Sequence, residues 1–225
     1  IDVALFGNRL LLSANYYNSR TTDMLYLYNV SVPPFTYNTL LANIGSMRNW
    51  GTEIAIGITP LKIKDMELNI NANITFQRNK LLSLSGMYNG EMLSAPEYKS
   101  LASLDGAGFH GGYNHIVYQM VGQPLGVFYL PHSTGLESDG NGGYTYGIAD
   151  LNGGGVSLED GEDRYVAGQA VPKTILGSNI SFRYKRFDLS LQVNGAFGHK
   201  IYNGTSLTYM TVSYTHLTLP TNREV

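Results

Sequence analysis

The segment LNINANITFQ, residues 68–77, alternates apolar and polar side chains at every position. A β-strand repeats every two residues, so this pattern predicts a strand with one apolar and one polar face. A soluble sandwich would turn the apolar face inward, whereas a membrane barrel would turn it towards lipid. The apolar set is Leu68, Ile70, Ala72, Ile74 and Phe76, and the polar set is Asn69, Asn71, Asn73, Thr75 and Gln77.

The same two-residue period predicts further strands at 9–19 and 49–58, and a hairpin with arms at 178–184 and 187–195. In the hairpin, Tyr184 and Phe187 flank Lys185-Arg186 and both belong to the apolar set. Residues that flank a two-residue turn pair directly and point the same way, so this hairpin is self-consistent. Lys-Arg is a poor pair for such a turn, which leaves a longer turn open.

The predicted connections differ greatly in length. Residues 59–65 and the Lys185-Arg186 pair are short, whereas 21–48 and 81 to about 114 are long and rich in Gly, Tyr, Asn and Pro. Strands of alternating direction place short turns at one end and long loops at the other, which is typical of outer-membrane barrels. Between residues 81 and 175 the chain crosses the membrane either not at all or twice, because the strands on either side run in opposite directions. Two crossings would use 118–131 as a strand. We expect mainly loop with some strand there.

The aromatic residues of these strands fall at two levels. If the first strand ascends, one group lies at the outer level and the other lies at the inner level, about one strand length away. Two aromatic girdles at that separation indicate the two interfaces of a bilayer. The outer group is Tyr16, Tyr17, Trp50 and Phe76, and the inner group is Tyr184 and Phe187.

Composition excludes several classes of protein. Charged residues make up 14%, the net charge is −2 and no Lys/Arg-rich run occurs, so nucleic-acid binding has no electrostatic support. The absence of cysteine excludes a disulfide scaffold and a thiolate metal site. No apolar run reaches the roughly 18 residues of a membrane-spanning helix. The chain also carries no H-E-x-x-H, G-x-S-x-G or P-loop motif, so we expect no enzyme activity.

The two ends of the sequence predict a fragment. The chain begins IDVALFGNRL, without an initiator Met or a signal-like segment, which suggests a start inside a longer protein. Residues 212–225, VSYTHLTLPTNREV, look like the translated read-through of a sequencing adapter. We therefore take 1–211 as barrel fragment and 212–225 as a non-native tail. The alternative is a short genuine strand, because SYTHLTL alternates tolerably.

Several motifs together resemble one family. NRLLLSANYYNSRTTDML, NIGSMRNWGTEIAIGITPLK, VGQPLGVFY, DLNGGGVSLEDGEDRYVAG and FRYKRFDLSLQVNGAFGHKIYN resemble, in this order, segments of SusC/RagA-type TonB-dependent outer-membrane transporters. The resemblance implies an all-β fold, with about five to seven antiparallel strands of a 22-stranded transmembrane β-barrel and long extracellular loops.

The same resemblance implies a function. It implies import of glycans or peptides across the outer membrane of a Gram-negative bacterium. It further implies a SusD-like surface lipoprotein as a lid, and TonB as the energy source acting through a plug domain that this chain lacks. The runner-up from the residues is a soluble, calcium-dependent carbohydrate-binding domain. Covered side chains at Ile70, Ile74, Leu189 and Leu191 would indicate this soluble domain, and bare ones the barrel.

One segment carries possible ligand chemistry for a metal ion. DLNGGGVSLEDGED is similar to the family's Asp-x-Asn-Gly-Asp-Gly segment and to a calcium-binding EF-hand loop. Asp150 and Asn152 fill the first two ligand positions, Gly154 replaces an expected Asp, and one inserted residue brings Glu162 to the last position. Such a site would bind Ca²⁺ weakly. The alternative is a Gly-rich acidic turn without metal.

Candidate substrate contacts are weaker still. The amides that we expect to face the lumen, which could hydrogen-bond a sugar, are Asn69, Asn71, Asn73 and Gln77. Alternatively, these amides only keep the inner barrel wall hydrated or contact the plug domain. The loop aromatics that could stack on a sugar or touch the lid are Tyr26, Tyr28, Phe35 and Tyr37. A solvated loop or a contact with lipid headgroups explains them equally well.

Overall fold

The computed structural model describes residues 1–96, 98–103, 115–138, 140–157 and 162–203. The regular secondary structure in these ranges consists of β-strands, as expected. The chain divides into two compact units, which we describe separately: 1–98 with 120–125 and 171–199, and 99–119 with 126–170 and 200–225. The suspected tail, 212–225, lies outside the described residues. Among the described residues we find no helix with the length and apolar character to cross a membrane.

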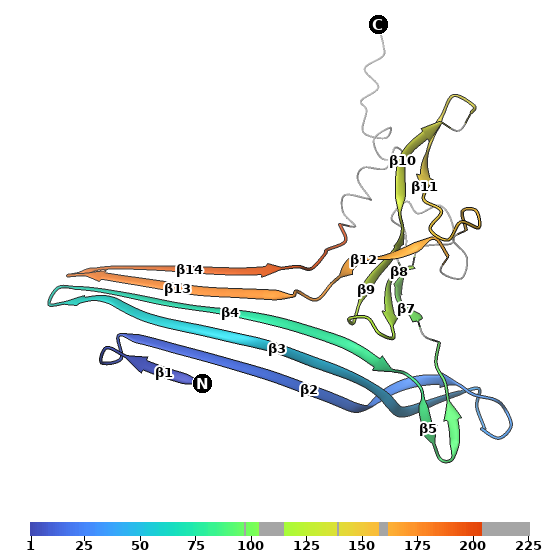
Figure 1. The fold of residues 1–225 in the computed structure, drawn as a ribbon, viewed down its shortest axis with the longest axis horizontal. Coiled ribbons are helices and arrows are strands. Elements are labelled where there is room, and N and C mark those ends of the chain that lie inside the picture. Colours follow the sequence, from blue (N-terminus) through green and yellow to red (C-terminus); the bar gives the residue numbers. More distant parts are fainter. Residues whose placement is uncertain (97, 104–114, 139, 158–161, 204–225) are drawn as a thin grey trace, which may run out of the picture. The chain divides into compact units, whose positions relative to one another are not determined.

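The first unit is built on a six-stranded antiparallel sheet with the order β1-β2-β3-β4-β13-β14 (Figure 1). β4 pairs directly with β13, so the chain makes no crossing of this sheet between them. This decides between the zero and two crossings that the sequence left open. The strands are β1 (Asp2–Leu5), β2 (Leu10–Asn29), β3 (Thr39–Ile63), β4 (Met66–Ser83), β13 (Thr174–Tyr184) and β14 (Phe187–Phe197).

The register of this sheet preserves the alternation read from the sequence. Ile54 of β3 pairs with Ile74 of β4, and Ile74 pairs with Leu176 of β13. One residue further along each strand, Asn73 pairs with Ala55 and Gly177. Directly paired residues point to the same side of a sheet. The apolar positions therefore form one continuous face and the polar positions form the other.

Within the described part of the first unit, no second layer of side chains covers the apolar face. Leu189 and Leu191 are 54% and 52% exposed, and Ile54 is 43% exposed. Ile70 and Ile74 are only half-buried. In a soluble sandwich these side chains would be packed against another sheet. Their exposure is the outcome expected for a barrel wall.

The short turns are tighter than the sequence indicated. Tyr184 pairs with Phe187, so β13 and β14 are joined by Lys185-Arg186 alone, and Lys185 adopts a left-handed backbone with φ of 54°. The predicted connection at 59–65 is short, as expected, but its bounds are wrong, because β3 continues to Ile63 and β4 starts at Met66. The register shifts between Ile58 and Leu61. This bulge accommodates Pro60, which lacks the N–H that a ladder requires.

The predicted long loop at 21–48 is also wrong. β2 continues to Asn29 and β3 starts at Thr39, so only nine residues, 30–38, connect them. Tyr28 and Ala42 of these extensions are each 1% exposed and form a small core with Leu93 of the hairpin β5 (Gly86–Tyr88) and β6 (Glu91–Leu93). The Tyr26 and Tyr28 rings meet edge to face at 5.2 Å. Tyr28 is thus a core residue, whereas Tyr37 remains 75% exposed.

The second unit contains the remaining strands. A four-stranded sheet has the order β12-β9-β8-β7, and a separate hairpin pairs β10 with β11. The stretch 118–131, which two crossings would use as a strand, is divided between β8 and β9, which pair with each other. The strands are β7 (Tyr98–Ser103), β8 (His115–Met120), β9 (Val127–Pro131), β10 (Ser133–Ser138), β11 (Tyr144–Ile148) and β12 (Arg164–Gln169).

Candidate functional site

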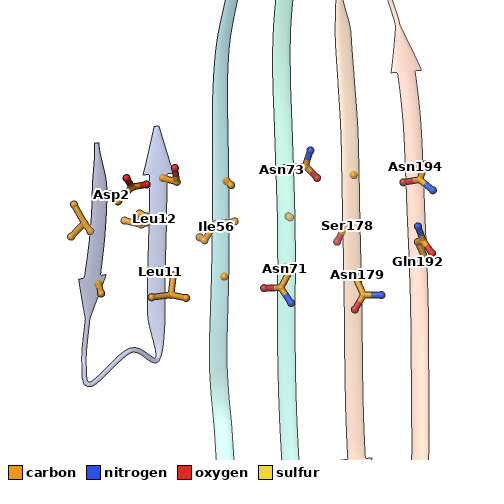
Figure 2. Close-up of a pocket in the computed structure, with 17 residues that line it drawn as sticks. Asp2, Leu11, Leu12, Ile56, Asn71, Asn73, Ser178, Asn179, Gln192 and Asn194 are labelled. Carbon is orange, nitrogen blue, oxygen red and sulfur yellow. The ribbon is translucent and has the colours of Figure 1, made fainter. Parts of the chain in front are cut away.

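The polar face of the six-stranded sheet holds a trough of about 610 Å³ (Figure 2). This volume lies within the range of small-molecule binding sites. Side chains from β1, β2, β3, β4, β13 and β14 line the trough, and Figure 2 shows that its amide side chains come from the last three strands. We call the five amides the amide cluster: Asn71, Asn73, Asn179, Gln192 and Asn194.

The register places the amide cluster in two neighbouring rows. Asn71 pairs with Asn179, and Asn179 pairs with Gln192, so three amides lie side by side on three strands. In the next row Gly177 stands between Asn73 and Asn194. Among the described residues, none of these five carboxamides makes a hydrogen bond. Their donors and acceptors are therefore available to solvent or to a ligand.

Two glycines make room for the amides. A Cβ at Gly177 would lie 2.5 Å from Oδ1 of Asn73, and a Cβ at Gly57 would lie 3.0 Å from Oδ1 of Asn71. Each asparagine side chain thus leans over a glycine on the neighbouring strand. Larger residues at these two positions would displace the amides, so the glycines help to shape the trough.

The predicted lumen amides separate into two groups. Asn71 and Asn73 line the trough, whereas Asn69 accepts a hydrogen bond from the Thr59 hydroxyl at 2.8 Å and donates one to Glu67 at 3.1 Å. Gln77 donates to the carbonyl oxygen of Pro172 at 2.9 Å. The side chains of Asn69 and Gln77 are therefore already hydrogen-bonded within the first unit. Sequence reasoning did not select Asn179, Gln192 and Asn194, although the same parity in their hairpin was a sufficient signal.

The charged groups beside the trough are few. Towards the turns, Arg183 is bonded to Asp188 at 3.0 Å, and Lys62 lies 4.0 Å from Glu67. Within each pair the positive and negative charges neutralise each other, at one end of the polar face. Asp2 is the charged residue that lines the trough. The trough itself is therefore uncharged apart from one carboxylate.

Aromatic residues occupy two levels of the apolar face. Thr52 pairs with both Tyr16 and Phe76, and Phe76 is joined across Thr174 to Phe197, so one row of side chains crosses the sheet. Met66, Tyr184 and Phe187 form the second row, ten residues away along β4. Trp50 lies on the same face near the first row, with the Arg48 guanidinium 5.2 Å from its ring. The predicted levels are confirmed, but Tyr17 belongs to the polar face.

The Gly-rich loop after β11 is organised by two aspartates. Both oxygens of Asp150 accept backbone N–H groups, from Gly153 at 2.5 Å and from Gly155 at 3.0 Å. Asp163 is only 3% exposed, and its carboxylate accepts the N–H of Leu151 at 2.6 Å and of Ser157 at 2.7 Å. These donors, led by Ser157, hold the pKa of Asp163 below its ordinary value.

The other two predicted calcium ligands, Asn152 and Glu162, differ in their surroundings. Asn152 accepts the N–H of Gly154 at 2.8 Å, and Glu162 is exposed. Within the described ranges no three His, Asp or Glu side chains lie close enough to hold a metal ion. Sequence reasoning chose Glu162, but its neighbour Asp163 is the carboxylate that turns into the loop. Calcium binding by Asp150, Asn152 and Glu162 remains a prediction.

The family is decided by a match over nearly the whole chain. The family model described as TonB dependent receptor-like, beta-barrel, matches residues 1–222. The chain belongs to this family. TonB-dependent receptors are β-barrel proteins of the outer membrane of Gram-negative bacteria, and they are transporters rather than enzymes.

Individual relatives agree with the SusC/RagA resemblance. TonB-dependent receptor P3 of Formosa agariphila (strain DSM 15362) is 30% identical over 220 residues, which cover 92% of this chain and 20% of that protein. SusC of Bacteroides thetaiotaomicron is 23% identical, with 90% and 19% covered. The RagAB peptide transporter structure matches the fold with a TM-score of 0.58 and 21% identity, covering 88% of this chain and 20% of that chain. The chain thus spans about a fifth of the length of these relatives.

Proposed function

We propose that this chain forms wall strands and loops of a SusC/RagA-type importer in the outer membrane of a Gram-negative bacterium. The observation that carries the proposal is the two-faced sheet, with a bare apolar side and free amides on the other. The ten residues between its two aromatic rows span about 33 Å along the strand, or about 23 Å across a membrane at a tilt near 45°. This agrees with the apolar band of about 25 Å in outer-membrane barrels.

The cargo of the complete receptor is a glycan or a peptide. SusC and RagAB support this, since the second is named a peptide transporter. We further infer that the receptor pairs with a SusD-like surface lipoprotein and is driven by TonB. The soluble, calcium-dependent carbohydrate-binding alternative has no support from the exposed leucines of β14.

Two adjacent residues provide the test of the membrane orientation. This chain contains no cysteine. In a full-length receptor from which any other cysteine has been removed, single cysteines introduced at Leu191 or Gln192 probe the two faces of β14. A water-soluble maleimide should label the Gln192→Cys variant in outer-membrane vesicles and leave Leu191→Cys unlabelled. A lipid-soluble maleimide should label Leu191→Cys. Labelling with the opposite preference, or recovery of the receptor in the soluble fraction, would refute the proposal.

Transport is tested in cells that express the full-length receptor. Uptake of a panel of oligosaccharides and oligopeptides should require an intact TonB and should fall to the background of a receptor deletion when TonB is removed. Uptake that is unaffected by TonB removal would contradict the energy source, although the outer-membrane assignment would stand.

A further inference from the structure

We propose that the trough is a subsite for a neutral oligosaccharide as it passes through the barrel. The inference rests on the proposed importer function and narrows its cargo to uncharged, hydroxyl-rich ligands. The contacts are assigned to the amide cluster, Asn71, Asn73, Asn179, Gln192 and Asn194.

The chemistry of the amide cluster matches that of a sugar. Each carboxamide offers an oxygen acceptor and two N–H donors, and each sugar hydroxyl both donates and accepts. The five amides are free among the described residues, whereas Asn69 and Gln77 on the same face are already bonded. Five unbonded amides thus lie next to one another at the trough.

The spacing of the amides suits a ligand larger than one sugar ring. Neighbouring strands lie about 4.8 Å apart, and alternate residues on one strand lie about 6.7 Å apart. Asn71, Asn179 and Gln192 therefore span about 10 Å across the sheet, and the second row adds about 7 Å along it. Several consecutive hydroxyls of an oligosaccharide can be contacted at once.

The charges at the trough disfavour anionic glycans. Asp2 is the charged residue in its lining, and Glu53 stands one row beyond the amide cluster, beside Thr75 and Asn73. The nearby cations Lys62 and Arg183 are each paired with a carboxylate. An acidic oligosaccharide would meet the carboxylates of Asp2 and Glu53, which disfavour its binding.

A peptide fits this surface less well. Peptides that bind to sheets usually add to an edge strand through backbone hydrogen bonds. The trough lies on the face of the sheet, where the ladder already uses the backbone groups of β4 and β13.

The residues lining the trough include no aromatic ring on which a sugar could stack. We therefore expect weak binding, which suits a passage from which the ligand must also leave.

The test measures binding to the purified full-length receptor by calorimetry. The probes are three neutral heptasaccharides (α-1,4-glucan, β-1,4-glucan and β-1,4-mannan), an oligogalacturonate of equal length, and an uncharged Gly-Ser heptapeptide. We expect at least one neutral heptasaccharide to bind more tightly than the oligogalacturonate and the peptide. The double variant Asn71→Ala/Asn179→Ala should weaken that binding about tenfold, because two hydrogen bonds are lost.

Two further variants separate a binding role from a structural one. Gly177→Ala should weaken sugar binding because its Cβ displaces the Asn73 amide, 2.5 Å away. Asn49→Ala, which removes an amide that points to the same side but lies outside the trough, should leave binding unchanged. The thermal midpoint of the receptor should not move in these variants. A lowered midpoint with intact sugar binding would mean that the trough seats another part of the receptor, and would overturn the inference.

The remaining outcomes distinguish this inference from the proposed function. Tighter binding of the peptide or the oligogalacturonate, or no binding of any neutral heptasaccharide, would overturn the subsite. TonB-dependent uptake in the same cells would leave the importer proposal standing in each of those cases. Loss of TonB dependence with intact, amide-dependent sugar binding would refute the driven import alone.

Discussion

The Tyr17 side chain lies over Gly51 of the neighbouring strand, so that a Cβ at Gly51 would be 2.6 Å from the tyrosine oxygen. The two residues are directly paired in the β2–β3 ladder. The same Cβ would lie 2.5 Å from the carbonyl oxygen of Phe76 on β4. The absence of a side chain at Gly51 thus leaves room for the Tyr17 side chain and for the Phe76 carbonyl oxygen.

Gly51→Ala should destabilise the full-length receptor by about 1–3 kcal/mol, because the added methyl meets backbone as well as the tyrosine ring. The measurement is the guanidinium midpoint of the receptor refolded into lipid vesicles. Gly57→Ala is the matched control, since its Cβ would meet only the movable end of Asn71 at 3.0 Å and Leu11 at 3.6 Å. Equal losses in the two variants would contradict the role given to Tyr17 and Phe76.

Ile70→Arg should cost the receptor about 2–4 kcal/mol, the loss expected for a cation facing lipid near the midplane. Ile70 lies between the two aromatic rows and pairs with Ile58 and Ile180 on the apolar face. Asn71→Arg, on the polar face one residue away, should cost much less. Comparable losses in vesicle unfolding titrations would show that the two faces do not differ in environment.

Asp163→Asn should loosen the Gly-rich loop, because the carboxylate accepts two short backbone N–H bonds, from Leu151 and Ser157. Hydrogen exchange of the peptides that contain these residues should become faster in the full-length receptor at neutral pH. Glu162→Gln, at the exposed neighbouring position, serves as the control and should leave exchange unchanged.

The loop should also respond to acid in one direction. The pKa of Asp163 is lowered in the folded protein, so its ionised carboxylate stabilises the loop at neutral pH. This stabilisation disappears as the pH falls through the lowered pKa, because the protonated group is a poorer acceptor. Proteolysis of the loop after brief acid exposure is the measurement. A loop in the Asp163→Asn variant that showed the same acid-induced change would exclude Asp163 as its cause.

Lys185→Gly should stabilise the β13–β14 hairpin by about 0.5 kcal/mol. The left-handed backbone of Lys185 costs about 1–2 kcal/mol, and glycine loses about 0.5–1 kcal/mol of extra chain entropy. The change also removes an exposed contact of the Lys185 ammonium with the Tyr184 ring at 5.4 Å. Arg186→Gly should instead destabilise, since Arg186 has no positive φ to relieve. The guanidinium midpoints of the two variants should therefore move in opposite directions.

The strand faces were predictable because strand periodicity is local. Leu68, Ile70 and Ile74 alternate with amides, and any pairing that keeps parity places them together on one face. The parity of Tyr184 and Phe187 about their turn was equally decisive. The two levels of aromatic side chains were predictable in the same way, by counting residues along each strand.

The lengths of the strands were not predictable in the same way. Residues 21–48 are rich in Asn, Pro and Tyr and suggested a loop, yet β2 and β3 continue through them. There the strands extend because they pair with each other and cover Tyr28 and Ala42 with Leu93, a residue far away in sequence. Long-range burial overrides local propensity at such positions. Pro60 likewise falls in the predicted connection at 59–65, although it sits at a bulge within β3.

The sequence by itself determined the two faces of each strand, the aromatic levels and the family, because these depend on residue order within short windows. Only the tertiary structure decided that β4 and β13 are neighbours, and that Asn71, Asn179 and Gln192 meet in one row while Asn69 and Gln77 are already bonded. Which amides remain free depends on partners from distant parts of the chain, and no local pattern records those partners.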